Sequence, residues 1–404
     1  MSSDSGVAVT PEVGDPFARV VPPPDPDRRP GGSYGSPEMI QILTPEGEFI
    51  EHPQYGRFLE DLTDDDLRGF YRDQVLIRRL DTEATALQRQ GQLGLWASML
   101  GQEAAQVGCG RAMRPQDYAF PGYREHGVAW CRGVDPLELV ALFRGTNKGG
   151  WDPAEHNFHL FTIVIGNQVL LATGYAMGIL LDGDVGTDDP ERDTAVMAFF
   201  GDGATAQGDV NESFVFAAVH NAPIVFFCQN NQWAISEPNW RQTAIPLYKR
   251  ASGFGFPGVQ VDGNDVLATY AVTRAMLERA RSGEGPAFIE AFTYRMGAHT
   301  TSDDPTKYRV SAEVEVWKHR DPIARLKVYL SRSGKADSTF FADVEAEADA
   351  LAEKLRRETH AMPDPTPESM FDHAYSEPHA QVDRDRAEFR AYQEAFADVE
   401  GEQA

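Results

Sequence analysis

Apolar residues along this chain follow two kinds of spacing. Residues 63–90 open with Thr-Asp-Asp-Asp-Leu and continue with apolar positions three and four residues apart, which predicts an amphipathic helix capped by Thr63. Residues 102–113, 135–143, 210–219 and 265–281 carry further helical patterns. Apolar runs at 194–200, 223–228, 258–261 and 287–294 are typical of buried strands. This alternation predicts an α/β fold, a doubly wound parallel sheet with helices on both faces.

Shorter segments complete the expected fold. Ile40 to Glu51 predicts a hairpin around a Pro-Glu-Gly turn, and Tyr118 to Pro121 predicts a short strand. Gly166 to Leu181 is apolar on most sides, which predicts a buried helix. Asp343 to Thr359 predicts a helix that is either amphipathic or solvated on all sides.

Composition divides the chain into three parts. Residues 1–37 are rich in Pro, Gly, Ser and Asp, which predicts a disordered tail because too little apolar area is available to offset chain entropy. Residues 38–330 carry the alternating strands and helices and form the expected main domain. Residues 331–404 are charged and predict a helical C-terminal extension.

Charge and cysteine content narrow the class of protein. The formal net charge of -25 disfavours binding to nucleic acid or to an anionic membrane, because phosphate would be repelled over most of the surface. Neither a membrane-spanning apolar run nor a secretory leader is recognisable. Three widely spaced cysteines without a C-x-x-C pair fit a reducing environment. We therefore expect a soluble protein of the cytoplasm.

The candidate chemistry lies between Gly201 and Asn231. A buried strand ends at Gly201-Asp202-Gly203, where glycines allow a tight turn and a close backbone approach to a ligand. We expect the helix that follows to point its positive N-terminus at a phosphate. Asp202 supplies a carboxylate oxygen, and Asn231 supplies an amide oxygen after the next strand. With diphosphate oxygens, these ligands predict a Mg²⁺ site at the carboxyl edge of the sheet.

With these motifs the chain resembles the α subunit of the E1 component of 2-oxo acid dehydrogenase complexes, which are thiamin-diphosphate-dependent enzymes. The resemblance runs from about Leu62 to Leu330. It rests on PGYREHG (121–127), the GDG to Asn-Asn segment, VDGND (261–265) and YRMGAHTTSDDPTKYR (294–309). The last loop is most similar to that of branched-chain members, although some bacterial pyruvate enzymes carry a similar one.

The resemblance implies a set of site residues and the thiamin-diphosphate-binding fold. His299 is the implied catalytic histidine, which would also contact the cofactor, and Arg309 would order its loop. Gln229 stands where some relatives have Arg, so one phosphate contact is expected to be missing. An alternative role for Arg124 is a surface ion pair with Glu125. The implied cofactor contacts come from Tyr123, Arg124, Ile165, Asp202, Gly203, Ala204, Asn231 and His299, and the implied metal ligands are Asp202, Asn231 and the carbonyl of Trp233.

The family also implies partners and a reaction. The chain carries one diphosphate motif, so the pyrimidine-activating Glu is expected from an E1 β subunit in an α2β2 heterotetramer. The implied reaction is oxidative decarboxylation of a branched-chain 2-oxo acid, 3-methyl-2-oxobutanoate, with acyl transfer to the lipoyl group of the E2 core. Pyruvate is the alternative substrate. A dinucleotide dehydrogenase is disfavoured because the third glycine of G-x-G-x-x-G is absent after Phe200. A non-enzymatic scaffold stays open.

Overall fold

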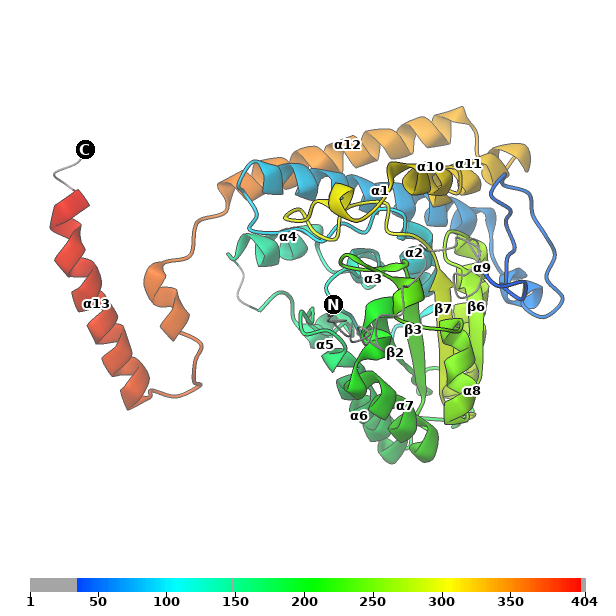
Figure 1. Ribbon diagram of the computed structural model, residues 1–404, viewed down its shortest axis with the longest axis horizontal. Coiled ribbons are helices and arrows are strands. Elements are labelled where there is room, and N and C mark those ends of the chain that lie inside the picture. Colours follow the sequence, from blue (N-terminus) through cyan, green and yellow to red (C-terminus); the bar gives the residue numbers. More distant parts are fainter. Residues whose placement is uncertain (1–34, 147–148, 401–404) are drawn as a thin grey trace, which may run out of the picture.

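A computed structural model describes residues 35–146 and 149–400 of the chain, with side chains as far as residue 396 (Figure 1). The predicted disordered tail, residues 1–37, lies almost wholly outside the described residues. The division of the chain at residue 330 stays a prediction.

A five-stranded, all-parallel sheet forms the centre of the fold. Its strand order is β1-β2-β3-β7-β6. Every residue of β3 and β7 is buried, as expected for apolar runs covered on both faces. The strands span Tyr118–Phe120 (β1), Val196–Gly201 (β2), Ile224–Asn230 (β3), Gly258–Asp262 (β6) and Ala287–Phe292 (β7).

Helices cover both faces of this sheet, which confirms the doubly wound prediction. Side chains alternate along each strand, so that Phe199 and Phe227 join one hydrophobic cluster and Phe200 and Phe226 join the other. The first cluster includes α1 (Asp64–Arg89), α2 (Glu103–Ala112) and α9 (Val266–Arg281). The second includes α6 (Asn167–Asp182), α7 (Gly208–His220) and α8 (Arg250–Phe254).

Local chemistry explains where the main helices begin. Thr63 and Asp66 form a capping box at the start of α1, as the Thr-Asp-Asp-Asp segment predicts. The side chain of Asp135 caps α4 (Pro136–Arg144), and that of Asp265 caps α9. The remaining helices are α3 (His126–Cys131), α5 (Pro153–His156), α10 (Ser311–Lys318), α11 (Pro322–Arg332), α12 (Ser338–Ala361) and α13 (Ala380–Glu400).

The C-terminal region is helical, as predicted. Of the two alternatives for 343–359, the amphipathic one is confirmed, because α12 buries Phe341, Val344, Ala348 and Leu355 in the core beside α1. Figure 1 shows α12 running along α1, whereas α13 lies away from the central sheet and contacts residues 367–372.

Residues 40–51 form the expected short hairpin, with an antiparallel bridge from Leu43 to Phe49 and a backbone hydrogen bond from Ile50 to Ile42, while Ile40 pairs with Val261. One sequence expectation needs correction. Helix α6 is not buried on most sides, since Leu171 and Tyr175 are exposed on its outer face. The predicted helical stretch 210–219 lies within α7, and a 3-10 helix, η3 (Asp202–Ala206), links β2 to it.

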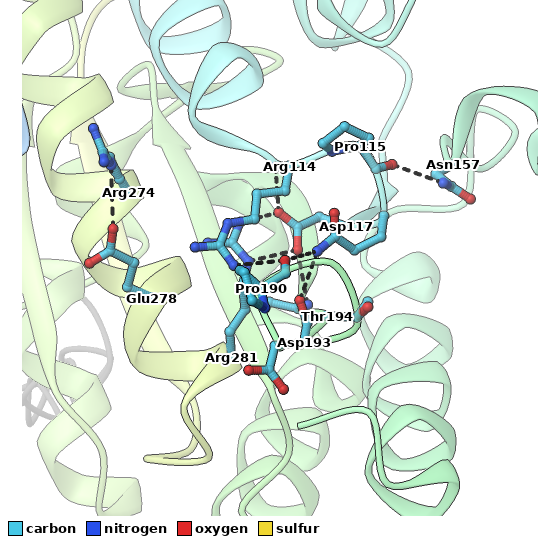
Figure 2. Close-up of polar contacts among 12 residues, drawn as sticks. Arg114, Pro115, Asp117, Asn157, Pro190, Asp193, Thr194, Arg274, Glu278 and Arg281 are labelled. Carbon is cyan, nitrogen blue, oxygen red and sulfur yellow. Dashed lines mark hydrogen bonds and ion pairs between the residues drawn. The ribbon is translucent and has the colours of Figure 1, made fainter. Parts of the chain in front are cut away.

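A buried ion pair fixes the amino end of the sheet, opposite the site (Figure 2). Arg281, at the end of α9, donates through two guanidinium nitrogens to the Asp117 carboxylate, and both residues are almost fully buried. The same carboxylate accepts from the backbone N–H groups of Arg114 and Ala195, at 2.6 and 3.0 Å. Asp117 thereby holds the starts of β1 and β2 against α9.

Candidate active site

A cavity of about 290 Å³ opens at the carboxyl ends of β2 and β3. This is the edge at which parallel α/β sheets bind ligands. Every cofactor and metal residue implied by the family resemblance lines it, although those residues come from five separate segments of the chain. Arg309 lies outside the lining and donates to the backbone carbonyls of Arg295, Met296 and Gly297. The cavity therefore brings together all of the predicted contact residues.

Asp202 is oriented by two amide side chains. It is 1% exposed, and its Oδ2 accepts from Asn239 Nδ2 at 3.3 Å and Gln242 Nε2 at 3.4 Å. Burial raises the pKa of Asp202 to about 6, against the lowering effect of these donors and of Arg295. Because both amides bond the same oxygen, Oδ1 is left for a ligand in the cavity.

The two other implied metal ligands are also held in place. The Oδ1 atom of Asn231 accepts from the backbone N–H of Trp233 at 3.3 Å, while its Nδ2 donates to Gln102 Oε1 at 3.1 Å. The carbonyl of Trp233 accepts from Arg295 at 3.0 Å. A carbonyl oxygen has two lone pairs, so this contact leaves one for a cation.

The turn after β2 depends on one glycine. A Cβ at Gly203 would lie 2.6 Å from the Cβ of Ala234 in β4 (Trp233–Ala234), which is the first strand of a short hairpin with β5 (Glu237–Pro238). Gly201 has ordinary extended backbone, and a Cβ there would meet nothing within 4 Å. Of these two glycines, only Gly203 is required, because Ala234 lies too close to leave room for a Cβ atom.

Arg124 and Tyr123 surround His299. The guanidinium of Arg124 donates to the carbonyls of Ser98 and His299, and its Nη2 lies 3.3 Å from His299 Nδ1. The Tyr123 ring contacts the imidazole edge-on, with centroids 6.1 Å apart. The alternative of a surface Arg paired with Glu125 is wrong, because Arg124 is 7% exposed and its guanidinium contacts are with Ser98 and His299.

A second arginine reaches the same imidazole. Arg295 Nη1 lies 3.3 Å from His299 Nδ1, and its Nη2 donates to Tyr308 Oη at 3.0 Å. Burial, then Arg124 and then Arg295 lower the pKa of His299 to about 4. Asp303 accepts from the His299 backbone N–H at 2.9 Å and from Tyr308. The histidine is thus neutral at pH 7 and sits in a loop ordered by buried polar contacts.

Several lining residues had no role in the sequence prediction. Gln102 and Gln168 are buried, and Gln102 Nε2, Gln168 Oε1 and Arg295 Nε lack a protein partner. Such unpaired atoms are costly in a dry interior and require a partner, either ordered water or a bound polar group. Arg295 lies within the 294–309 motif and could have been found there, whereas no local pattern marks Gln102 or Gln168. No group of three or more His, Cys, Asp or Glu side chains able to hold a metal occurs among the described residues.

The fold and the cavity define an α/β protein with a polar ligand cavity at the carboxyl edge of a parallel sheet. The comparisons with known proteins refine this class. The model of the family "Dehydrogenase E1 component" matches residues 71–368, and the chain belongs to that family. E1 dehydrogenases depend on thiamin diphosphate. In the part of the chain that the structure describes, no helix is both long and apolar enough to cross a bilayer.

Individual relatives are α subunits. The chain is 42% identical over 367 residues to the Mycobacterium tuberculosis 3-methyl-2-oxobutanoate dehydrogenase subunit alpha, covering 90% of this chain and 97% of the relative. It is 38% identical over 299 residues to the Staphylococcus aureus pyruvate dehydrogenase E1 component subunit alpha, with 74% and 78% covered. The corresponding subunit of Acholeplasma laidlawii is 40% identical over 336 residues, with 81% and 94% covered.

Proposed function

We propose that this chain is the α subunit of a branched-chain 2-oxo acid dehydrogenase E1 that binds thiamin diphosphate and Mg²⁺ in the cavity. The observation that carries the proposal is the convergence of Asp202, Asn231, Trp233, Arg124 and His299 on one buried cavity. The reaction is the oxidative decarboxylation of 3-methyl-2-oxobutanoate, with transfer of the acyl group to the lipoyl group of E2.

The donor set fits the cofactor. Oδ1 of Asp202, the amide of Asn231 and the carbonyl of Trp233 are hard oxygen ligands of the kind that Mg²⁺ prefers. Gln102, Gly203 and Ala204 line the same cavity, and the backbone N–H groups of Gly203 and Ala204 would face the diphosphate. Bound thiamin diphosphate supplies the electron sink for decarboxylation.

His299 works at the reacting end as a neutral imidazole. Arginine nitrogens only donate, so the two guanidinium contacts make Nδ1 the acceptor and leave the proton on Nε2. His299 therefore offers an N–H donor to the substrate or to a leaving group, and it is held there by Arg124 and Arg295.

Exposed apolar residues at the mouth of the cavity are consistent with the binding of a partner chain. Ile163, Val164 and Ile165 are consecutive and exposed, and Ile165 is the cavity wall residue among them. A contiguous apolar mouth beside a polar cavity is typical of an interaction surface. We assign it to the E1 β subunit, which would complete the site with the pyrimidine-activating Glu in an α2β2 heterotetramer.

A reducing, cytoplasmic location is part of the proposal, since Cys109, Cys131 and Cys228 are free thiols.

The choice of substrate rests on the Mycobacterium tuberculosis relative, which is named for 3-methyl-2-oxobutanoate and matches this chain over 97% of its own length. Pyruvate is the second candidate, because two of the other relatives are named pyruvate dehydrogenase subunits.

The test is a decarboxylation assay of the chain co-expressed with its β partner, in the presence of thiamin diphosphate and Mg²⁺. We expect turnover of 3-methyl-2-oxobutanoate at a higher kcat/KM than pyruvate. Asp202→Ala is expected to abolish Mg²⁺-dependent cofactor binding and turnover together, whereas unchanged complex activity in that variant would favour a scaffold role. A higher kcat/KM for pyruvate would move the assignment to the second candidate.

A further inference from the structure

Glu125 is a carboxyl group in the wall of the cavity that the proposed reaction does not use. It precedes α3, is 3% exposed and lines the cavity together with Gly122 and Gln229. Its Oε2 lies beside Gly122 and accepts a long contact, 3.4 Å, from the backbone N–H of Arg124, and the backbone N–H groups of Gly122 and Glu125 also face the carboxyl group. A carboxylate in this position would face an anionic diphosphate, which is electrostatically unfavourable.

A chain of three amide and carboxyl groups fixes the direction of the hydrogen bonds that reach Glu125. The backbone N–H of Gly127 can only donate, and it donates to Gln106 Oε1 at 2.7 Å. Gln106 Nε2 therefore donates to Gln229 Oε1 at 3.1 Å, and Gln229 Nε2 donates to Glu125 Oε1 at 2.7 Å. Oε1 is thereby fixed as an acceptor, so a proton on Glu125 must reside on Oε2.

The surroundings favour the neutral form. Burial raises the pKa of Glu125, although backbone N–H groups and the nearby Arg124 lower it in part. The guanidinium of Arg124 is engaged by Ser98 and His299. Other titratable or charged groups near Glu125 are Cys109 on α2, the adjacent His126, and the cavity residues Tyr123, Asp202, Arg295 and His299.

We propose that Glu125 is a neutral carboxylic acid when the diphosphate is bound, and that its Oε2–H donates a hydrogen bond to a phosphate oxygen. A carboxyl group that is kept neutral in this way acts as a donor rather than a repelling charge. Gln229 orients this donor through its contact with Oε1. The inference rests on the proposed cofactor and predicts that cofactor binding takes up one proton from solvent wherever free Glu125 is ionised.

The experiment is titration calorimetry of thiamin diphosphate with Mg²⁺ into the complex of this chain and its β partner. Runs in buffers of different ionisation enthalpy between pH 6.5 and 8.5 give the number of protons taken up. We expect the wild-type affinity to fall up to tenfold per pH unit above the pKa of free Glu125, as one linked proton requires. In Glu125→Gln, which keeps a neutral donor at the same place, the net proton uptake should fall by up to one relative to the wild type, and the affinity should become flatter with pH.

Two controls separate the outcomes. The exposed Glu60→Gln should bind with the wild-type proton uptake. Infrared difference spectra of the wild-type complex should show a protonated-carboxyl band on cofactor binding, a readout that does not depend on the variant folding. Equal proton uptake in the wild type and in Glu125→Gln, or absence of the band, would overturn the inference while leaving the proposed function intact. Failure of the wild type to bind the cofactor would instead remove the proposed function.

Discussion

The Nδ1 atom of His299 lies 3.3 Å from a guanidinium nitrogen of Arg295, a side chain that is itself buried. An arginine in this position cannot accept a proton, so the contact fixes both the tautomer and the charge of the imidazole. Burial first, and then the positive charge of Arg124, lower the pKa of Arg295 itself to about 10. The pair therefore acts as a positioning device for a neutral histidine.

His299 should titrate far below the usual histidine range. We expect a pKa near 4 in histidine-selective NMR, assigned with His299→Asn. Arg295→Gln removes a positive neighbour and should move this pKa upward, because the imidazolium form becomes less disfavoured. Lys307→Gln, which removes a nearby but highly exposed cation, should leave the pKa unchanged. A wild-type pKa of 6 or above would contradict the arrangement.

The sign of the pH effect on stability follows from the same shift. The unfolded chain protonates His299 near pH 6.5, whereas the folded chain protonates it near pH 4. Between these values the unfolded state binds the extra proton, so this group makes the free energy of unfolding fall as the pH falls from 6.5 to 4. Denaturant titrations at several pH values, compared with His299→Asn, measure this contribution as the difference in slope.

Asn239 and Gln242 should determine how well Asp202 holds a cation. Both donate to one carboxylate oxygen, and replacement of such outer partners typically lowers metal affinity about 10–100-fold. We expect Asn239→Ala and Gln242→Ala each to raise the Mg²⁺ concentration needed for cofactor binding, with little change at saturating Mg²⁺. The exposed Gln90→Ala serves as the control. An unaltered Mg²⁺ requirement in both variants would remove this role.

Gly203→Ala should destabilise the turn after β2. The added Cβ would meet the Ala234 Cβ at 2.6 Å, and overpacking of this kind typically costs about 1–3 kcal/mol. The matched variant Gly201→Ala places its Cβ in open space and should change the free energy of unfolding much less. Chemical denaturation of both variants provides the comparison. Equal stability losses would show that the close approach to Ala234 is not what requires the glycine.

Arg281→Met should be strongly destabilising. It leaves the buried Asp117 carboxylate without its cation, which typically costs about 3–5 kcal/mol. Lys318→Met breaks an exposed pair with Glu315 and should cost less than about 1 kcal/mol. Urea unfolding of the two variants tests this difference. Because Asp117 lies at the opposite edge of the sheet, folded Arg281→Met should still bind the cofactor.

The local elements were predictable because their causes lie within a few residues of each other. The capping box of Thr63 and Asp66, the Asp135 cap and the buried apolar strands depend on side chains close in sequence. The burial of α6 was predicted wrongly, since composition reports how apolar a helix is but not which of its faces has a neighbour.

The sequence by itself determined the parallel α/β architecture and placed Asp202 and Asn231 at one edge of the sheet, because the carboxyl ends of parallel strands meet there. The resemblance of its motifs to a known family supplied the other predicted contact residues of the cavity. Only the tertiary structure decided the protonation and orientation of those residues. Gln102, Gln229 and Arg295 contact Asn231, Glu125 and Trp233, which lie more than sixty residues away in the sequence. Burial also shifts the pKa values of Asp202 and His299. Such contacts depend on distance in space and on exclusion of water, which no short stretch of sequence encodes.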